Sequence, residues 1–114
     1  MNAPVTRAVL LAAGRGTRLG EVTRTTPKPL LRVGGEPILH RILGALRAGG
    51  VREVAIVTGH LADLVEDATG DGRRWGLSLT YFRQESIDGT ARALLLAREF
   101  VARERFFLGW GDIV

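Results

Sequence analysis

The chain has 114 residues, of which 46% are hydrophobic, and a formal net charge of +4 at pH 7. This length suffices for one small domain with its own core. The absence of cysteine excludes disulfides, thiolate metal sites and cysteine nucleophiles. No apolar run approaches the ~20 residues that span a bilayer, and no signal-peptide pattern opens the chain, so we expect a cytoplasmic protein without a membrane partner.

Positive charge is concentrated near the start of the chain. Residues 1–35 contain five arginines and Lys28 against a single acid, Glu21, which gives this segment a net charge of +5. The remaining residues carry a net charge of −1. A local excess of positive charge attracts anionic ligands. The later arginines are matched by acids and form no basic run, so a nucleic-acid partner is not expected.

The first predicted element is a buried strand over residues 7–12, an apolar run that leads into a turn containing Gly14 and Gly16. Glycines allow the backbone to come close to a ligand, and the N–H groups of such a turn favour phosphate. Lys28 follows between two prolines, which stiffen its approach to a site. It is the only lysine beside fifteen arginines, which indicates that its compact charge matters. Together these features predict a polyphosphate cradle.

Predicted helices and strands alternate along the rest of the chain. The helices cover residues 37–48, 61–68 and 90–103, and the strands cover residues 54–57, 77–82 and 106–108. Pro37 suits the first turn of its helix. Strands that alternate with helices favour an α/β fold with a parallel sheet and right-handed crossovers.

Polar residues follow the predicted strands at their carboxyl ends, where ligands of parallel sheets bind. Strand 77–82 leads to Gln84, strand 106–108 leads to Asp112, and Gly89-Thr90 begins the third helix. A strand-end aspartate usually only caps or ends its strand. Beside a triphosphate, however, its carboxylate could hold Mg²⁺, which takes one or two carboxylates plus phosphate oxygens. We therefore expect these segments to meet the glycine turn at one edge of the sheet.

Two familiar nucleotide-binding motifs do not fit. A dinucleotide-binding fingerprint needs its third glycine at position 19, which is Leu19, and Thr58-Gly59 stands where a ribose-binding acid is expected. A Walker-type loop needs a lysine directly after its last glycine, and Lys28 is too distant. The glycine turn is therefore predicted to be neither a dinucleotide-binding fingerprint nor a Walker-type loop.

Histidines and tryptophans have simpler interpretations. No cysteine accompanies His40 or His60 and no ligand spacing connects them, so both are predicted to be structural. Trp75 and Trp110 are predicted to be packing residues.

Several blocks of the sequence resemble the nucleotidyltransferases that activate sugar 1-phosphates. The most specific block is Leu-Ala-Ala-Gly-x-Gly-Thr-Arg-Leu at residues 11–19, followed by Thr-Pro-Lys-Pro-Leu at residues 26–30. The similarity continues through Val33-x-Gly35-x-Pro37-Ile38, Gln84, Gly89-Thr90-Ala91 and Gly111-Asp112. It covers nearly the whole chain in the same order and spacing.

The resemblance implies a Rossmann-like three-layer sandwich with a mainly parallel sheet. It also implies an enzyme that transfers a nucleoside monophosphate from a nucleoside triphosphate to a sugar 1-phosphate, giving an NDP-sugar and pyrophosphate. The implied catalytic and phosphate-binding residues are Arg18 and Lys28, and Asp112 would bind Mg²⁺. The rest of the implied nucleotide site consists of Leu11, Ala13, Gly14, Gly16, Thr17, Gln84, Gly89 and Thr90.

The chain departs from this family in its length. Family members are about twice as long, and residues 1–114 correspond to the N-terminal, nucleotide-binding portion of the domain. The sugar pocket and a second acidic metal ligand belong to the other half. We expect the last strand to form an unpaired sheet edge, which favours aggregation.

Two alternatives have different chemistry. One is transfer to another phosphorylated acceptor, such as choline phosphate or the pterin molybdopterin. The other is a non-catalytic nucleotide-binding or regulatory module in which the fold persists without turnover. The sequence leaves open the base, the sugar and the oligomeric state, including a homo-oligomer.

Overall fold

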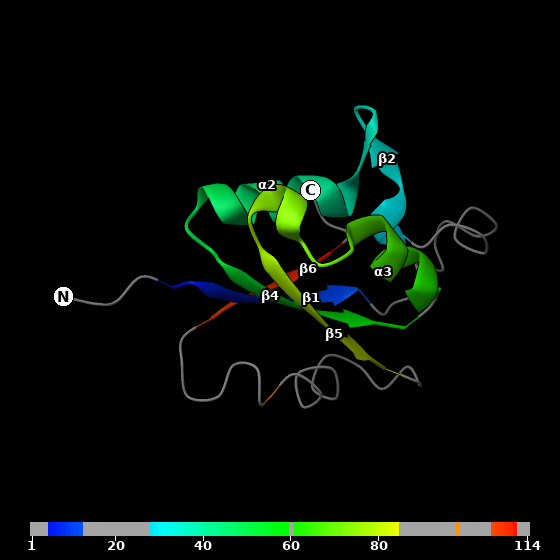
Figure 1. The fold of residues 1–114 in the computed structure, drawn as a ribbon. Coiled ribbons are helices and arrows are strands. Elements are labelled where there is room, and N and C mark those ends of the chain that lie inside the picture. The colour runs from blue at the N-terminus through cyan, green and yellow to red at the C-terminus, as the bar shows by residue number, and fades with distance from the viewer. Residues whose placement is uncertain (1–4, 13–27, 60, 85–97, 99–105, 112–114) are drawn as a thin grey trace.

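Four strands form a parallel sheet in the computed structural model, which describes residues 5–12, 28–59, 61–84, 98 and 106–111 (Figure 1). The strands are β1 (Arg7–Ala12), β4 (Glu53–Thr58), β5 (Ser78–Arg83) and β6 (Phe107–Trp110), and their order in the sheet is β5-β4-β1-β6. All three strand pairs are parallel. The predicted strands are thus confirmed, with small shifts at their ends.

Two helices cover one face of this sheet. They are α2 (Ile38–Ala48) and α3 (Ala62–Thr69), and both lie on the same side in Figure 1. Leu39 and Leu43 of α2 and Val65 of α3 are fully buried against the even-numbered side chains of β1 and β4, such as Leu10 and Ile56. This packing arises because alternate residues of a strand point to the same face.

The opposite face of the sheet is also buried. Val9 and Leu11 of β1 form a second apolar cluster with Ala55 and Val57 of β4, and each is at most 8% exposed. Burial on both faces explains why these strands are continuous apolar runs, as is typical of parallel sheets. The predicted helix over residues 90–103 lies outside the described residues, apart from Arg98, which is helical.

A short hairpin precedes α2 and was not predicted. Its strands, β2 (Arg32–Val33) and β3 (Glu36–Pro37), are antiparallel and are joined by Gly34 and Gly35, both with positive φ. Pro37 pairs with Arg32 in this hairpin and has an extended ψ of 141°. It therefore immediately precedes α2, and its predicted place inside the first helical turn is wrong by one residue.

Two 3₁₀ turns complete the described structure: η2 (Lys28–Leu30) and η3 (Arg73–Trp75). Trp75 is half-buried and packs against the core under α2, as predicted. Its ring meets the ring of His40 edge-on at 5.0 Å, and His40 Nε2 donates a hydrogen bond to the Ala68 carbonyl at 2.9 Å. His40 therefore has the structural role that was predicted, whereas His60 lies outside the described residues.

Trp110 does not have the packing role predicted for it. Its side chain is 47% exposed, because β6 is the last strand in the described sheet and pairs only with β1. Phe107 and Leu108 of the same strand are similarly exposed. The predicted unpaired edge is thus present in the part of the chain that the structure describes. Among those residues, no helix is long and apolar enough to cross a membrane.

Gly72 provides a sharp test of this packing. Its φ is +85°, and a Cβ there would lie 2.5 Å from Leu79 Cγ and 2.9 Å from the Leu77 carbonyl oxygen. Gly35 has a similar φ of +89°, but a Cβ added to it would have no atom within 4 Å. We expect Gly35→Ala to lower the free energy of unfolding by about 1 kcal/mol through backbone strain alone.

Gly72→Ala should cost about 3 kcal/mol, since it adds steric overlap with a backbone atom to the same strain. Urea denaturation of the two variants measures the difference. Equal destabilisation would contradict the close approach of Gly72 to β5.

Tyr81 links β5 to the end of α3. Its hydroxyl donates a hydrogen bond to the Gly70 carbonyl at 2.5 Å and also contacts the Thr69 hydroxyl. Burial raises the pKa of Tyr81 above its ordinary value of 10.0; the hydrogen bond with Thr69 partly opposes this, and nearby Glu66 and Asp71 add to the increase. The folded state therefore favours the neutral phenol.

Because the folded-state pKa of Tyr81 is raised, its contribution to stability should be complete below pH 10 and should be lost as the pH rises through the folded-state pKa. Tyr81→Phe should cost about 1 kcal/mol at neutral pH through the lost hydrogen bond. It should also reduce the loss of stability above pH 10. Denaturation curves at neutral and alkaline pH measure both effects, and an unchanged alkaline slope in the variant would contradict this account.

Candidate functional site

The order of the strands creates a switch point at the carboxyl end of β1. From β1 the chain moves to β4 and then to β5 on one side, whereas β6 lies on the other side of β1. In open α/β sheets, ligands bind in the crevice outside the carboxyl ends of the strands where the strand order reverses in this way. The topology therefore predicts a ligand site just beyond the carboxyl ends of β1 and β6.

Backbone register brings the predicted site segments to the same edge. Ala12 is opposite Thr58, and Thr58 is opposite Arg83, so β1, β4 and β5 end side by side. The backbone N–H of Gln84 then donates a hydrogen bond to the Thr58 carbonyl at 2.7 Å, and the backbone N–H of Gly111 donates one to the Leu11 carbonyl at 3.1 Å. Ala12, Gln84 and Gly111 consequently lie at the same edge, and they are the described residues at which the predicted site segments begin or end.

Three predicted site residues fall among those described. Leu11 lies inside β1 with its side chain buried, and its carbonyl already accepts the bond from Gly111. Gln84 is half-buried at the end of β5. Lys28 begins η2. The other predicted positions lie outside the described residues: Ala13, Gly14, Gly16, Thr17, Arg18, Gly89, Thr90 and Asp112.

The backbone next to Lys28 is firmly anchored. Pro29 is fully buried, and Leu30 packs against the core cluster under α2. The η2 turn contacts both α2 and α3. Pro29 therefore holds the segment after Lys28 in place, because a buried ring cannot move without opening the core, whereas Pro27 lies outside the described residues.

An ion-pair cluster at the carboxyl edge was missed by the sequence analysis. Arg83 Nε lies 2.9 Å from Glu66 Oε2, and Arg83 Nη2 lies 3.2 Å from Glu66 Oε1 and 2.5 Å from Asp63 Oδ1. Hydrogen bonds to Glu66 and then to Asp63 raise the pKa of Arg83 further above its already high value. Thr58 Oγ1 donates to the same Glu66 Oε2 at 3.3 Å. The cluster joins β4, α3 and β5.

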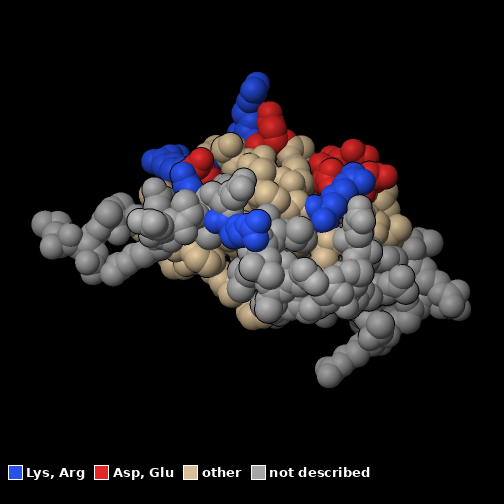
Figure 2. Space-filling view, turned by 90° about the horizontal axis from the view of Figure 1, so that it is seen from below, with Lys and Arg blue, Asp and Glu red and all other residues tan. Residues whose placement is uncertain are grey.

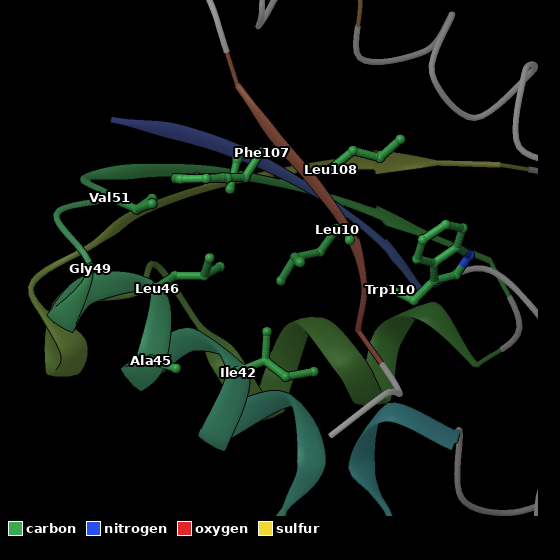
Figure 3. Close-up of a pocket in the computed structure, with 11 residues that line it drawn as sticks. Leu10, Ile42, Ala45, Leu46, Gly49, Val51, Phe107, Leu108 and Trp110 are labelled. Carbon is green, nitrogen blue, oxygen red and sulfur yellow. The ribbon is translucent and has the colours of Figure 1, made fainter. Parts of the chain in front are cut away.

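A hollow of about 510 Å³ lies elsewhere, between α2 and the β1–β6 edge (Figure 3). Figure 3 shows Ile42 and Leu46 of α2 pointing toward Leu10 of β1. The described residues that line it include no acidic, basic or hydroxyl side chain: Ala8, Leu10, Ile42, Ala45, Leu46, Gly49, Val51, Phe107, Leu108, Gly109 and Trp110. A hollow without charged or hydroxyl side chains offers little to hold a phosphate, so this is not the predicted nucleotide site.

Comparison with known proteins agrees with the fold and with the sequence blocks. A family model described as nucleotidyl transferase matches residues 7–114. Glucose-1-phosphate thymidylyltransferase of Streptomyces griseus is 41% identical over 93% of this chain. N-acetylmuramate alpha-1-phosphate uridylyltransferase of Neisseria meningitidis is 41% identical over 95% of this chain. A crystal structure of a glucose-1-phosphate thymidylyltransferase from Bacillus anthracis superposes on 95% of the chain with a TM-score of 0.87 and 34% identity.

These relatives are much longer than this chain. It spans 30% of the Streptomyces protein, 47% of the Neisseria protein and 44% of the Bacillus chain. The similarity therefore covers less than half of the length of each of these relatives.

Proposed function

Because the chain belongs to the nucleotidyl transferase family, we propose that it is the nucleotide-binding part of an enzyme that makes NDP-sugars. The enzyme would transfer a nucleoside monophosphate from a nucleoside triphosphate to a sugar 1-phosphate and release pyrophosphate. The names of the thymidylyltransferase and the uridylyltransferase support this reaction class.

One observation carries the proposal: the glycine turn and Asp112 follow adjacent strands at the switch point, with Gln84 beyond β5 on the other side of β1. Neighbouring strands are about 4.8 Å apart, so β5 lies about 10 Å from β1. This separation suits a nucleotide that lies across the strand ends. Its phosphates would lie near β1 and β6, and its base would lie near Gln84.

The residues of the chain would act mainly by positioning and charge. Backbone N–H groups of the glycine turn would bind phosphate oxygens, and Arg18 and Lys28 would compensate their negative charge. The attacking group is an oxygen of the sugar phosphate, which is already anionic near neutral pH, so no general base is needed. It would form a bond to the α-phosphorus while the bond to the leaving pyrophosphate breaks.

Asp112 is the residue we assign to Mg²⁺. The described residues contain no group of three or more His, Cys, Asp or Glu side chains that could hold a metal ion by themselves. A single carboxylate oxygen next to phosphate oxygens fits the hard-ligand preference of Mg²⁺. When bound, the ion would supply positive charge to the triphosphate oxygens.

Thymidine and uridine nucleotides are the preferred candidates, because both named relatives use a pyrimidine. A glutamine amide such as that of Gln84 can both donate to and accept from a pyrimidine edge. We assign the reaction to the cytoplasm, consistent with a chain that contains no cysteine.

Nucleic acid is less well supported as a partner. Figure 2 shows that the acidic side chains on the face seen there lie beside basic ones, and the described residues of that face form no continuous basic surface. A polynucleotide site would need such a surface.

Lys28→Ala should weaken the binding of Mg²⁺–thymidine triphosphate and Mg²⁺–uridine triphosphate about tenfold, through loss of a charged phosphate contact. Pyrophosphate should compete with both nucleotides. Isothermal titration calorimetry on the folded chain measures these affinities.

Arg52→Ala is the matched control, because exposed Arg52 precedes the opposite, amino end of β4. It removes the same charge and should change the affinities less than twofold, as expected for a distant screened charge. Equal effects of the two variants would contradict a local phosphate site. Failure of the folded chain to bind any triphosphate would contradict the proposal for this chain.

A further inference from the structure

We infer that the Glu66–Arg83 ion pair is a positioning device for Gln84 and thereby influences which base the site accepts. This inference rests on the proposed function, which assigns Gln84 to the base. Neither Glu66 nor Arg83 belongs to the sequence blocks that indicated the family.

The pair has a well-defined geometry. Nε and Nη2 of Arg83 face the two carboxylate oxygens of Glu66 at 2.9 and 3.2 Å. Such a two-point contact fixes the orientation of the guanidinium plane as well as its distance. Arg83 is the last residue of β5, so the contact also fixes where the strand ends relative to α3.

Thr58 of β4 connects the ion pair to Gln84. Its side chain is fully buried at the end of β4, and its hydroxyl donates to Glu66 Oε2 at 3.3 Å. Its carbonyl accepts the Gln84 amide at 2.7 Å. These links form a closed ring. Hydrogen bonds join Gln84 to Thr58, Thr58 to Glu66 and Glu66 to Arg83, and the peptide bond joins Arg83 to Gln84. Displacing any member changes the backbone position of Gln84.

Successive side chains of β5 point to opposite faces of the sheet, so the ion-pairing residue Arg83 and the proposed base-binding residue Gln84 have different surroundings. Leu79 and Tyr81 pack on the face covered by α2 and α3, and Arg83 is the next residue on that face. Gln84 follows at the strand end, where the predicted ligand lies. Arg83 thus acts through its neighbour, since its Nε and Nη2 atoms are directed toward α3.

The contribution of the pair to overall stability should be small. Arg83 is 54% exposed and Asp63 is 81% exposed, whereas Glu66 is 24% exposed. Solvent-exposed ion pairs contribute little to global stability, because water screens the charges. A positioning role and a merely stabilising role can therefore be distinguished by experiment.

The test compares Glu66→Gln and Arg83→Lys with the wild-type chain. Both variants remove the two-point contact while keeping side chains of similar length. We expect each to increase hydrogen exchange of the Gln84 amide about tenfold, as for loss of a charged hydrogen bond. The ratio of dissociation constants between preferred and disfavoured nucleoside triphosphates should fall by a similar factor, with little change in the midpoint of urea denaturation.

Arg73→Ala is the matched control. Arg73 forms an exposed pair with Asp71 on the same crossover, with Nε 3.7 Å from Oδ2. Its loss should change neither Gln84 exchange nor nucleotide selectivity. The reversed pair, Glu66→Arg with Arg83→Glu, should restore part of the exchange protection that either single reversal removes.

The outcomes separate the two claims. If the wild-type chain discriminates between triphosphates and both variants keep that discrimination, the inference is overturned. If the wild-type chain binds no triphosphate, the proposed function fails, and Gln84 exchange alone then decides whether the pair positions this residue. Unchanged exchange in both variants would overturn the inference in either case.

Discussion

β1 pairs with β4 along its whole length and with β6 from Ala8 to Leu11, and the rest of the structure depends on this central position. Its side chains alternate between two buried faces, so the strand cannot slip by one residue without exchanging one apolar core for the other. The register that results aligns the carboxyl ends of the strands. The end of β1, which the glycine turn follows in the sequence, thereby lies between β6, which precedes Asp112, and β4 and β5, the second of which precedes Gln84.

Two segments at the carboxyl edge of the sheet are held in place by different interactions, one by apolar packing and the other by an ion pair. The buried ring of Pro29 anchors the segment that carries Lys28, and the ion pair of Glu66 with Arg83 anchors the segment that carries Gln84. Both anchors lie outside the proposed ligand contacts. A site assembled from loop segments needs such support, because geometry at a phosphate or a base must be held within a fraction of an ångström.

Much of the fold was predictable because its signals are local. A few consecutive residues are enough to show the apolar runs of β1 and β4 and the helical spacing in α2. The candidate site could be proposed from the sequence as a set of segments, since the rule that ligands bind at carboxyl ends needs only the order of elements. The two-residue strands β2 and β3 were not predicted, because so short a pattern carries no periodicity. The pairing of Glu66 with Arg83 joins residues that are distant in sequence, so only the crossover geometry reveals it. Exposure of Trp110 depends on which strand lies next to β6, which local sequence does not specify.

The most direct test of the central claim is to locate the nucleotide by NMR. A ¹⁵N-labelled chain would be titrated with thymidine triphosphate and Mg²⁺ while its amide resonances are followed. The account predicts shifts that concentrate at the carboxyl edge, at Gly59, Gln84 and Gly111, with little change at Ser78 and Phe107 at the amino ends of their strands. Shifts that instead follow the apolar hollow between α2 and β6, or the amino edge of the sheet, would contradict it.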